Sequence, residues 1–259
     1  MNPFHKISDS LPSELNLSGA THVGLVRASN EDSFLCLEKK SGNAMLFGVA
    51  DGMGGHEFGE VASYLVMRYM LDAWHKLPTN SIHNTDQAID FLRFNLEKSN
   101  QHIYHVNKEL KIRWCMGTTV TMGMLVGNQL VVAQIGDSRC YKVSRKKMSQ
   151  ITIDQSWQEE MVRNGIMSAQ AASNHPLSNM LTNCLGAKNA LSVEFSIDTV
   201  SEGDRYIFCS DGLNSMVDDE IISKICQESS NPQKGVDELI KAALRNGGSD
   251  NVTVLCLYL

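Results

Sequence analysis

Four aspartates stand where apolar stretches of the sequence end or begin. Asp51 follows AMLFGVA, Asp137 follows LVVAQIG, Asp211 follows RYIFCS, and Asp250 precedes VTVLCLYL. Carboxylates that several strand ends deliver to one edge of a sheet would repel one another, so the pattern predicts a bound hard cation such as Mg²⁺ or Mn²⁺. Two cations fit four carboxylates better than one. Asp-Gly pairs also form ordinary turns, and this alternative stays open for each aspartate taken alone.

The stretches that position these aspartates are short, rich in apolar and β-branched residues, and bounded by Gly, Asp and Asn. This composition predicts strands. The predicted strands cover 33–38, 44–50, 119–126, 129–136, 139–143, 205–209 and 252–259. Gly127 and Asn128 form a two-residue gap between two of them, which predicts an antiparallel hairpin.

Apolar residues at three- and four-residue steps predict amphipathic helices over 57–77 and 86–110, the second with Thr85 as its N-cap. Another helix is expected to begin at Asn231 and Pro232 and to close at Gly247. Helices lie between groups of strands, and this order favours a mostly antiparallel α+β domain over a doubly wound parallel sheet.

A shorter helix is expected between the predicted strands. Ser156 and Glu159 form a capping box at its start, and Gly165 ends it.

Composition and cysteine usage exclude several classes of protein. The 259 residues carry a formal net charge of −6, which argues against a nucleic-acid or anionic-membrane binder, and no apolar run is long enough to cross a bilayer. The seven cysteines form no CxxC pair, so a zinc ribbon is not expected. None is followed six residues later by arginine, which argues against a cysteine nucleophile acting on phosphate. We expect a cytoplasmic monomer with reduced thiols.

Six motifs stand in an order that resembles the PPM (PP2C-type) phosphatases, and in particular their bacterial branch. They are RASNED, DGMGG with GEVAS, GTT, GDSR, SDGL and GSDNVTV. The resemblance covers about residues 21–259 and implies a single domain over 1–259. It implies a four-layer α-β-β-α sandwich of two mostly antiparallel sheets flanked by helices. It also implies hydrolysis of phosphoserine and phosphothreonine by a water activated between two Mn²⁺ or Mg²⁺ ions.

The resemblance assigns metal-binding roles to five residues. Asp51 would bridge the two ions, the Gly52 carbonyl would complete the second ion's shell, and Asp211 and Asp250 would hold the first. Glu31 would act on the second ion through water.

Further roles follow from the same resemblance. Asp137 would bind a third, weaker ion, and Arg27 would clamp the phosphate with its planar, bidentate guanidinium. Asp32 would orient Arg27 or the metal-bound waters. Taken alone, Glu31 and Asp32 could instead form a solvated turn, Arg27 could be a surface cation, and Asp137 could pair with Arg139.

One position departs from the family. The animal branch has a histidine as proton donor where this chain has Met53, whose thioether carries no proton. His56 is a candidate replacement, a turn or capping role for it stays open, and water is the other candidate donor. We therefore expect protonation of the leaving group by water to suffice.

Residues 155–183 match the family's flap beside the active site and are expected to shape substrate choice. Phosphoproteins are the expected partners, together with a bacterial Ser/Thr kinase whose action the enzyme would reverse. A catalytically silent binding module of the same fold is a second hypothesis, disfavoured by the intact Asp51, Asp211 and Asp250. A two-metal nuclease is a third, disfavoured by the acidic balance.

Overall fold

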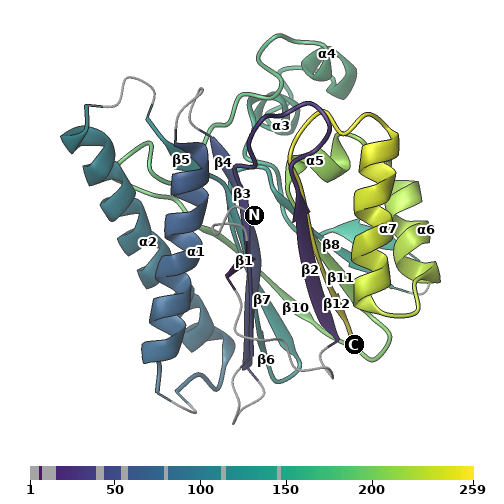
Figure 1. The fold of residues 1–259 in the computed structure, drawn as a ribbon, viewed down its shortest axis with the longest axis horizontal. Coiled ribbons are helices and arrows are strands. Elements are labelled where there is room, and N and C mark those ends of the chain that lie inside the picture. Colours follow the sequence, from purple (N-terminus) through teal and green to yellow (C-terminus); the bar gives the residue numbers. More distant parts are fainter. Residues whose placement is uncertain are drawn as a thin grey trace.

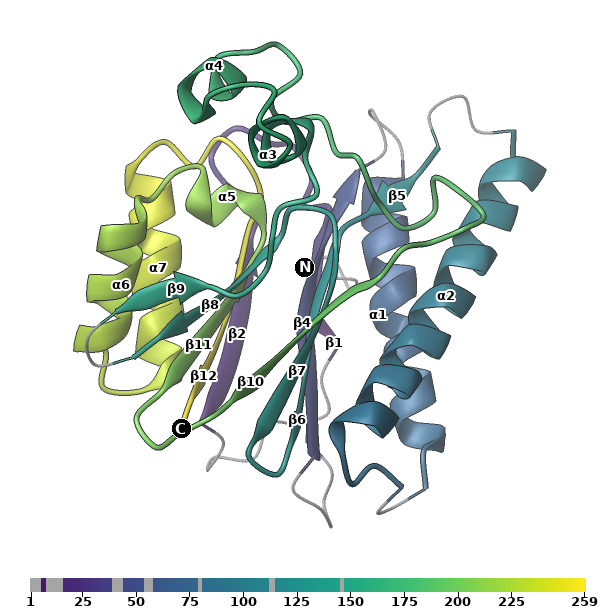
Figure 2. The same ribbon diagram turned by 180° about the vertical axis from the view of Figure 1, so that it is seen from behind.

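The computed structural model describes residues 6–7, 16–38, 44–53, 58–78, 81–111, 115–144 and 147–259. Two β-sheets pack face to face, and helices cover the outer face of each sheet (Figure 1 and Figure 2). The predicted four-layer α+β sandwich is confirmed. No helix in these ranges is both long and apolar enough to span a bilayer.

The first sheet has seven strands in the order β1-β3-β4-β6-β7-β10, with β5 paired to β4. They are β1 (Lys6–Ile7), β3 (Asp32–Glu38), β4 (Ala44–Met53), β5 (Gly117–Thr118), β6 (Val120–Val126), β7 (Gln129–Ile135) and β10 (Glu194–Thr199). Only β1 and β3, among the strands described, run parallel. Val126 pairs with Gln129 across Gly127, whose φ is 59°, so the predicted hairpin is confirmed.

The second sheet has five strands in the order β2-β12-β11-β8-β9. They are β2 (Leu17–His22), β12 (Val252–Tyr258), β11 (Arg205–Cys209), β8 (Arg139–Val143) and β9 (Met148–Gln150). The sequence did not predict β2, because LSGATH lacks the apolar run of a buried strand. Antiparallel pairing with the buried β12 supplies its order.

Helices α1 (Gly59–Lys76) and α2 (Thr85–Glu109) cover the first sheet. The second sheet is covered by α5 (Asp211–Asn214), α6 (Asp219–Glu228) and α7 (Pro232–Arg245). The helices predicted over 57–77 and 86–110 and from Asn231 are confirmed within two residues. One cap is corrected: Asn84, not Thr85, caps α2, because its side chain accepts a 2.9 Å hydrogen bond from the Gln87 amide.

Helices α3 (Trp157–Arg163) and α4 (Ala169–Ser173) lie together at one end of the sandwich (Figure 1). The Ser156 side chain caps α3 by accepting from the Glu159 amide, and the turn ends at Gly165 with a φ of 68°, as predicted. The short helices α4 and α5, and also α6, were not predicted.

Apolar side chains fill the spaces between all four layers. Between the sheets, the rings of Phe47 and Phe208 pack edge to face with centroids 5.2 Å apart. Trp74 of α1 is buried against the first sheet, and Leu239 of α7 against the second. These cores hold the two sheets, and therefore their strand ends, in a fixed relation.

Candidate active site

The sheet topology carries the four strand-end aspartates to one edge of the sandwich. β4 and β7 both run antiparallel to β6, so Asp51 near the end of β4 and Asp137 just after β7 lie at the same edge. β11 and β12 are antiparallel, so Asp211 after β11 lies beside Asp250 before β12. Strand direction thus places two aspartates at one edge of each sheet, and the face-to-face packing of the sheets brings the two edges together around one pocket.

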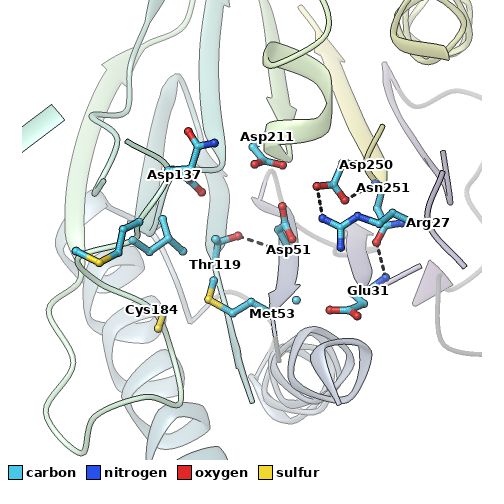
Figure 3. Close-up of a pocket in the computed structure, with 14 residues that line it drawn as sticks. Arg27, Glu31, Asp51, Met53, Thr119, Asp137, Cys184, Asp211, Asp250 and Asn251 are labelled. Atoms are coloured by element: carbon cyan, nitrogen blue, oxygen red, sulfur yellow. Dashed lines mark hydrogen bonds and ion pairs between the residues drawn. The ribbon is translucent and has the colours of Figure 1, made fainter. Parts of the chain in front are cut away.

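A pocket of about 550 Å³ opens at this edge (Figure 3). Its lining includes Arg27, Glu31, Asp51, Gly52, Met53, Thr119, Asp137, Asn179, Met180, Leu181, Cys184, Asp211, Asp250 and Asn251. The structure thus brings together seven of the nine residues singled out from the sequence. Asp32 lies outside this lining, and His56 lies outside the described residues.

The two threonines of the GTT motif hold Asp51 through its backbone. The Asp51 amide donates to Thr119 Oγ1 at 3.0 Å, and the Asp51 carbonyl accepts from the Thr118 hydroxyl and the Thr119 amide, each at 2.9 Å. Thr119 Oγ1 also lies 2.7 Å from the hydroxyl of Ser138, next to Asp137. These contacts fix where the two carboxylates emerge into the pocket.

The loop between β2 and β3 carries Arg27 and Glu31 to the pocket. Arg27 Nη2 donates a 2.8 Å hydrogen bond to Asp250 Oδ2, and 54% of the Arg27 side chain is exposed. The Glu31 carboxylate lies against Gly59, at the start of α1, where a side chain would collide with it. Glu31 is therefore built into the site, and Arg27 is held at its mouth, so neither is an isolated surface group.

The aspartates share an unfavourable electrostatic environment. Burial, with Asp32 and Asp211 nearby, raises the pKa of Asp51 well above its usual range. Burial, with Asp211 and Asp154 nearby, raises the pKa of Asp137 to about 7. Burial and Asp250 also raise the pKa of Asp211, although a hydrogen bond with Asp51 opposes this effect. A positive charge bound at this edge would lower these pKa values and so allow all the aspartates to ionise together.

Asp32 lies beneath the pocket in a polar network that joins the two sheets. It is 1% exposed, and its Oδ2 accepts hydrogen bonds from Ser210 Oγ at 2.8 Å and from Thr253 Oγ1 at 2.6 Å. Burial outweighs these bonds and raises its pKa to about 7. The expectation that Asp32 orients Arg27 is corrected, because Asp250 makes that contact. Its predicted role toward waters stays a prediction.

Divalent cations fit this group of residues. All candidate ligands are oxygen donors, as Mg²⁺ and Mn²⁺ prefer. Within the described ranges, the buried Oδ1 of Asp32 has no hydrogen-bond partner, which suits a carboxylate oxygen facing a hydrated ion. No three acidic, histidine or cysteine side chains of the described part converge tightly enough to hold an ion by themselves. Mg²⁺ needs only one or two direct carboxylates because it keeps several waters.

Asp137 does not form an ion pair with Arg139, which was the alternative to its metal-binding role. Arg139 instead forms a forked ion pair with Asp154, in which Nε and Nη2 lie 2.6–3.0 Å from the carboxylate oxygens. Asp154 stands immediately before the segment 155–183. The pair therefore ties the base of this segment to β8 and leaves Asp137 facing the pocket.

The segment 155–183 projects from a narrow base beside the pocket. Trp157 and Met180 are joined by a backbone hydrogen bond of 2.8 Å, and Thr182 donates to the Gln155 carbonyl at 2.9 Å. Met180 is 47% exposed and lies in the pocket lining. Residues 179–181 belong to the segment 155–183 that was expected beside the active site. No site role was predicted for Thr119, Cys184 or Asn251, although Thr119 and Asn251 stand inside the motifs quoted above.

Comparison with known proteins decides the family. The profile described as protein phosphatase 2C matches residues 19–246. The chain belongs to the protein phosphatase 2C family. The match includes every residue that lines the pocket except Asp250 and Asn251, which lie shortly after its end and just before β12. The resemblance inferred from six motifs is confirmed.

Bacterial members are similar to this PP2C-type phosphatase over nearly their whole length. The serine/threonine phosphatase stp of Listeria monocytogenes is 33% identical over 236 residues, which cover 91% of this chain and 92% of stp. The S. agalactiae serine/threonine phosphatase structure has a TM-score of 0.88 at 29% identity, covering 94% and 98% of the two chains. The catalytic domain of PstP, in complex with 2 manganese ions, has a TM-score of 0.77 at 32% identity, covering 93% and 96%.

Proposed function

We propose that this PP2C-type phosphatase hydrolyses phosphoserine and phosphothreonine in proteins with two Mn²⁺ or Mg²⁺ ions held at the aspartate edge. Asp51 would serve both ions, Asp211 and Asp250 would hold the first, and the Gly52 carbonyl, with Glu31 acting through water, would serve the second. A third, weaker ion would bind at Asp137. The gathering of these oxygen donors around one pocket supports the proposal. The two manganese ions of the related PstP domain support the metal count.

Such ions supply an activated water near neutral pH and neutralise charge on phosphoryl oxygens. The chain itself positions the phosphate. The Arg27 guanidinium stands across from Asp51 with a planar fork of donors that matches phosphate oxygens. Partial burial disfavours its charge, but Asp250, Glu31 and Asp51 outweigh burial and raise the pKa of Arg27. It remains a cation throughout the reaction.

The leaving serine or threonine oxygen needs a proton. Met53 lines the pocket where the animal branch has its histidine, and it has none to give. Water would serve as the donor, in keeping with the openness of the pocket mouth at the half-exposed Arg27. His56 stays an untested alternative.

The substrates would be phosphoproteins that a Ser/Thr kinase of the same cell has modified. The exposed Met180 and its neighbours Asn179 and Leu181 form the pocket wall that the 155–183 segment contributes, and they would meet the polypeptide around the phosphorylated residue. Thioether side chains adapt to varied partners. A phosphoproteome of a deletion strain would identify the targets.

Phosphate release from a phosphothreonine peptide, with and without Mn²⁺, tests the proposal. The wild type should require the ion. Asp211→Asn should lose activity by about a hundredfold or more, because bound ions lower the activation barrier by several kcal/mol. Asp90→Asn, on the exposed face of α2, is the matched control and should keep full activity. A folded wild type that binds the phosphopeptide without releasing phosphate would support the silent binding module instead.

A further inference from the structure

The side chain of Asn251 makes all its hydrogen bonds to one short loop. Asn251 is 6% exposed and stands between Asp250 and β12. Its Nδ2 donates to the carbonyl oxygens of Val23 and Ser29, both at 2.9 Å. Its Oδ1 accepts from the Glu31 amide at 2.8 Å. Both N–H groups and the oxygen of the side-chain amide thus form hydrogen bonds with the loop 23–31.

This loop has no strand or helix of its own, so its position depends on such tethers. Leu25 donates a 2.7 Å backbone hydrogen bond to the Gly248 carbonyl. Gly24 has a φ of 83° and lies so close to the Asp250 and Gly248 carbonyls that a side chain there would collide. The loop is therefore held against the segment 248–251 at several points.

Asn251 also connects to the aspartates on its own side. Its backbone amide donates to Asp250 Oδ1 at 2.8 Å, while Asp250 Oδ2 accepts from Arg27. Its carbonyl packs against Gly212, next to Asp211, where a side chain would collide. One residue thus links two predicted metal ligands to the loop that carries the phosphate clamp (Figure 3).

We propose that Asn251 is a positioning residue for the phosphatase reaction, which holds Arg27 and Glu31 in register with Asp250 and Asp211. The inference rests on the proposed function, because Asn251 would act only by placing residues that take part in that reaction. Only a primary amide of this length offers two donors and one acceptor in a plane. Asn251→Asp keeps the size of the side chain but loses both donors and points a charge at two carbonyls.

The chain offers a matched control in Asn100 of α2. Asn100 is 1% exposed, donates to the Lys188 and Asn189 carbonyls at 2.9 and 3.1 Å, and accepts from the Gly186 amide at 2.7 Å. The two asparagines therefore are both buried and have the same three-bond pattern, but Asn100 holds a different loop. Asn100→Asp should cost comparable stability without disturbing Arg27 or Glu31.

The experiment compares full-length wild type, Asn251→Asp and Asn100→Asp. Mn²⁺ binding is measured first through the Mn²⁺-induced rise in Tm, which does not depend on activity. The Mn²⁺ concentration that gives half of this rise should increase about tenfold for Asn251→Asp, because residues that orient metal ligands affect metal affinity by this much. KM for a phosphothreonine peptide and the inhibition constant of inorganic phosphate should also rise about tenfold, because Arg27 is displaced. Asn100→Asp should leave all three quantities unchanged.

A double variant identifies the route of the effect. If Asn251 acts on phosphate through Arg27, Asn251→Asp should raise KM little further in an Arg27→Ala background. Asn251→Ala, which adds no charge, repeats the test should Asn251→Asp not fold.

Failure of the proposed function and failure of the positioning role of Asn251 give different results. A folded wild type that releases no phosphate overturns the proposed function. An active wild type whose Asn251 variants lose Tm yet keep the KM, phosphate inhibition and Mn²⁺ dependence of Asn100→Asp overturns only the positioning role.

Discussion

Arg27 Nη2 lies 2.8 Å from Asp250 Oδ2, although 223 positions separate the two residues in sequence. The pair joins the predicted phosphate clamp to a predicted metal ligand. A cation bound at Asp250 would draw charge from the carboxylate and weaken its hold on the guanidinium. Cation binding and phosphate binding are therefore expected to be coupled.

Arg27→Ala should raise KM for a phosphothreonine peptide by about 10- to 100-fold, because a hydrogen bond to a charged group contributes about 1.5–3 kcal/mol. Arg27→Lys should recover only part of the loss, since a lysine lacks the planar fork. Steady-state kinetics on both variants measure this. Arg68→Ala, at an exposed ion pair on α1, is the control. An unchanged KM for Arg27→Ala would remove the clamp role.

Gly59→Ala should weaken cation binding. The added methyl group would occupy the place of the Glu31 carboxylate, which must then move away from the pocket. We expect the Mn²⁺ concentration for half-maximal activity to increase about tenfold or more. Gly235→Ala is the matched control. It adds a methyl group to helix α7, away from the pocket, where the methyl group would crowd the Tyr258 hydroxyl. Equal Mn²⁺ dependence in the two variants would contradict the role of Glu31.

The metal-free protein should lose stability as the pH rises from about 4 to 7. Asp32 and Asp137 have pKa values of about 7 when folded, above their unfolded values, so the folded state binds more protons across this range. The free energy of unfolding therefore falls as these groups ionise, and Mn²⁺ should restore it. Tm measured against pH with a chelator checks this. Asp137→Asn should flatten the slope and Asp90→Asn should not; identical slopes would refute the assignment.

His56→Ala should keep its rate and pH profile on phosphoserine peptides, because water is expected to protonate the leaving oxygen. Hydrolysis of p-nitrophenyl phosphate serves as the comparison, since its leaving group hardly needs a proton. A collapse on the peptide with the aryl phosphate unaffected would make His56 the proton donor instead.

Much of the fold follows from local sequence patterns. The amphipathic stretches that became α1, α2 and α7 bury one face each, and the hairpin at Gly127 needs only a residue that tolerates positive φ. β2 escaped prediction because its ordering comes from β12, more than 200 positions away. The α2 cap was misassigned by one residue because Asn84 and Thr85 are both good caps, and local backbone geometry selects between them.

The sequence by itself determined that aspartates would gather at strand ends, and the order of its motifs determined the family. Which residues hold those aspartates was decided only by tertiary structure. Arg139 pairs with Asp154 and not with Asp137. Asn251 forms hydrogen bonds with a loop that lies 220 and more positions earlier in the sequence. Hydrogen bonds of this kind depend on how two packed sheets bring distant segments together, and no local spacing in the chain encodes that distance.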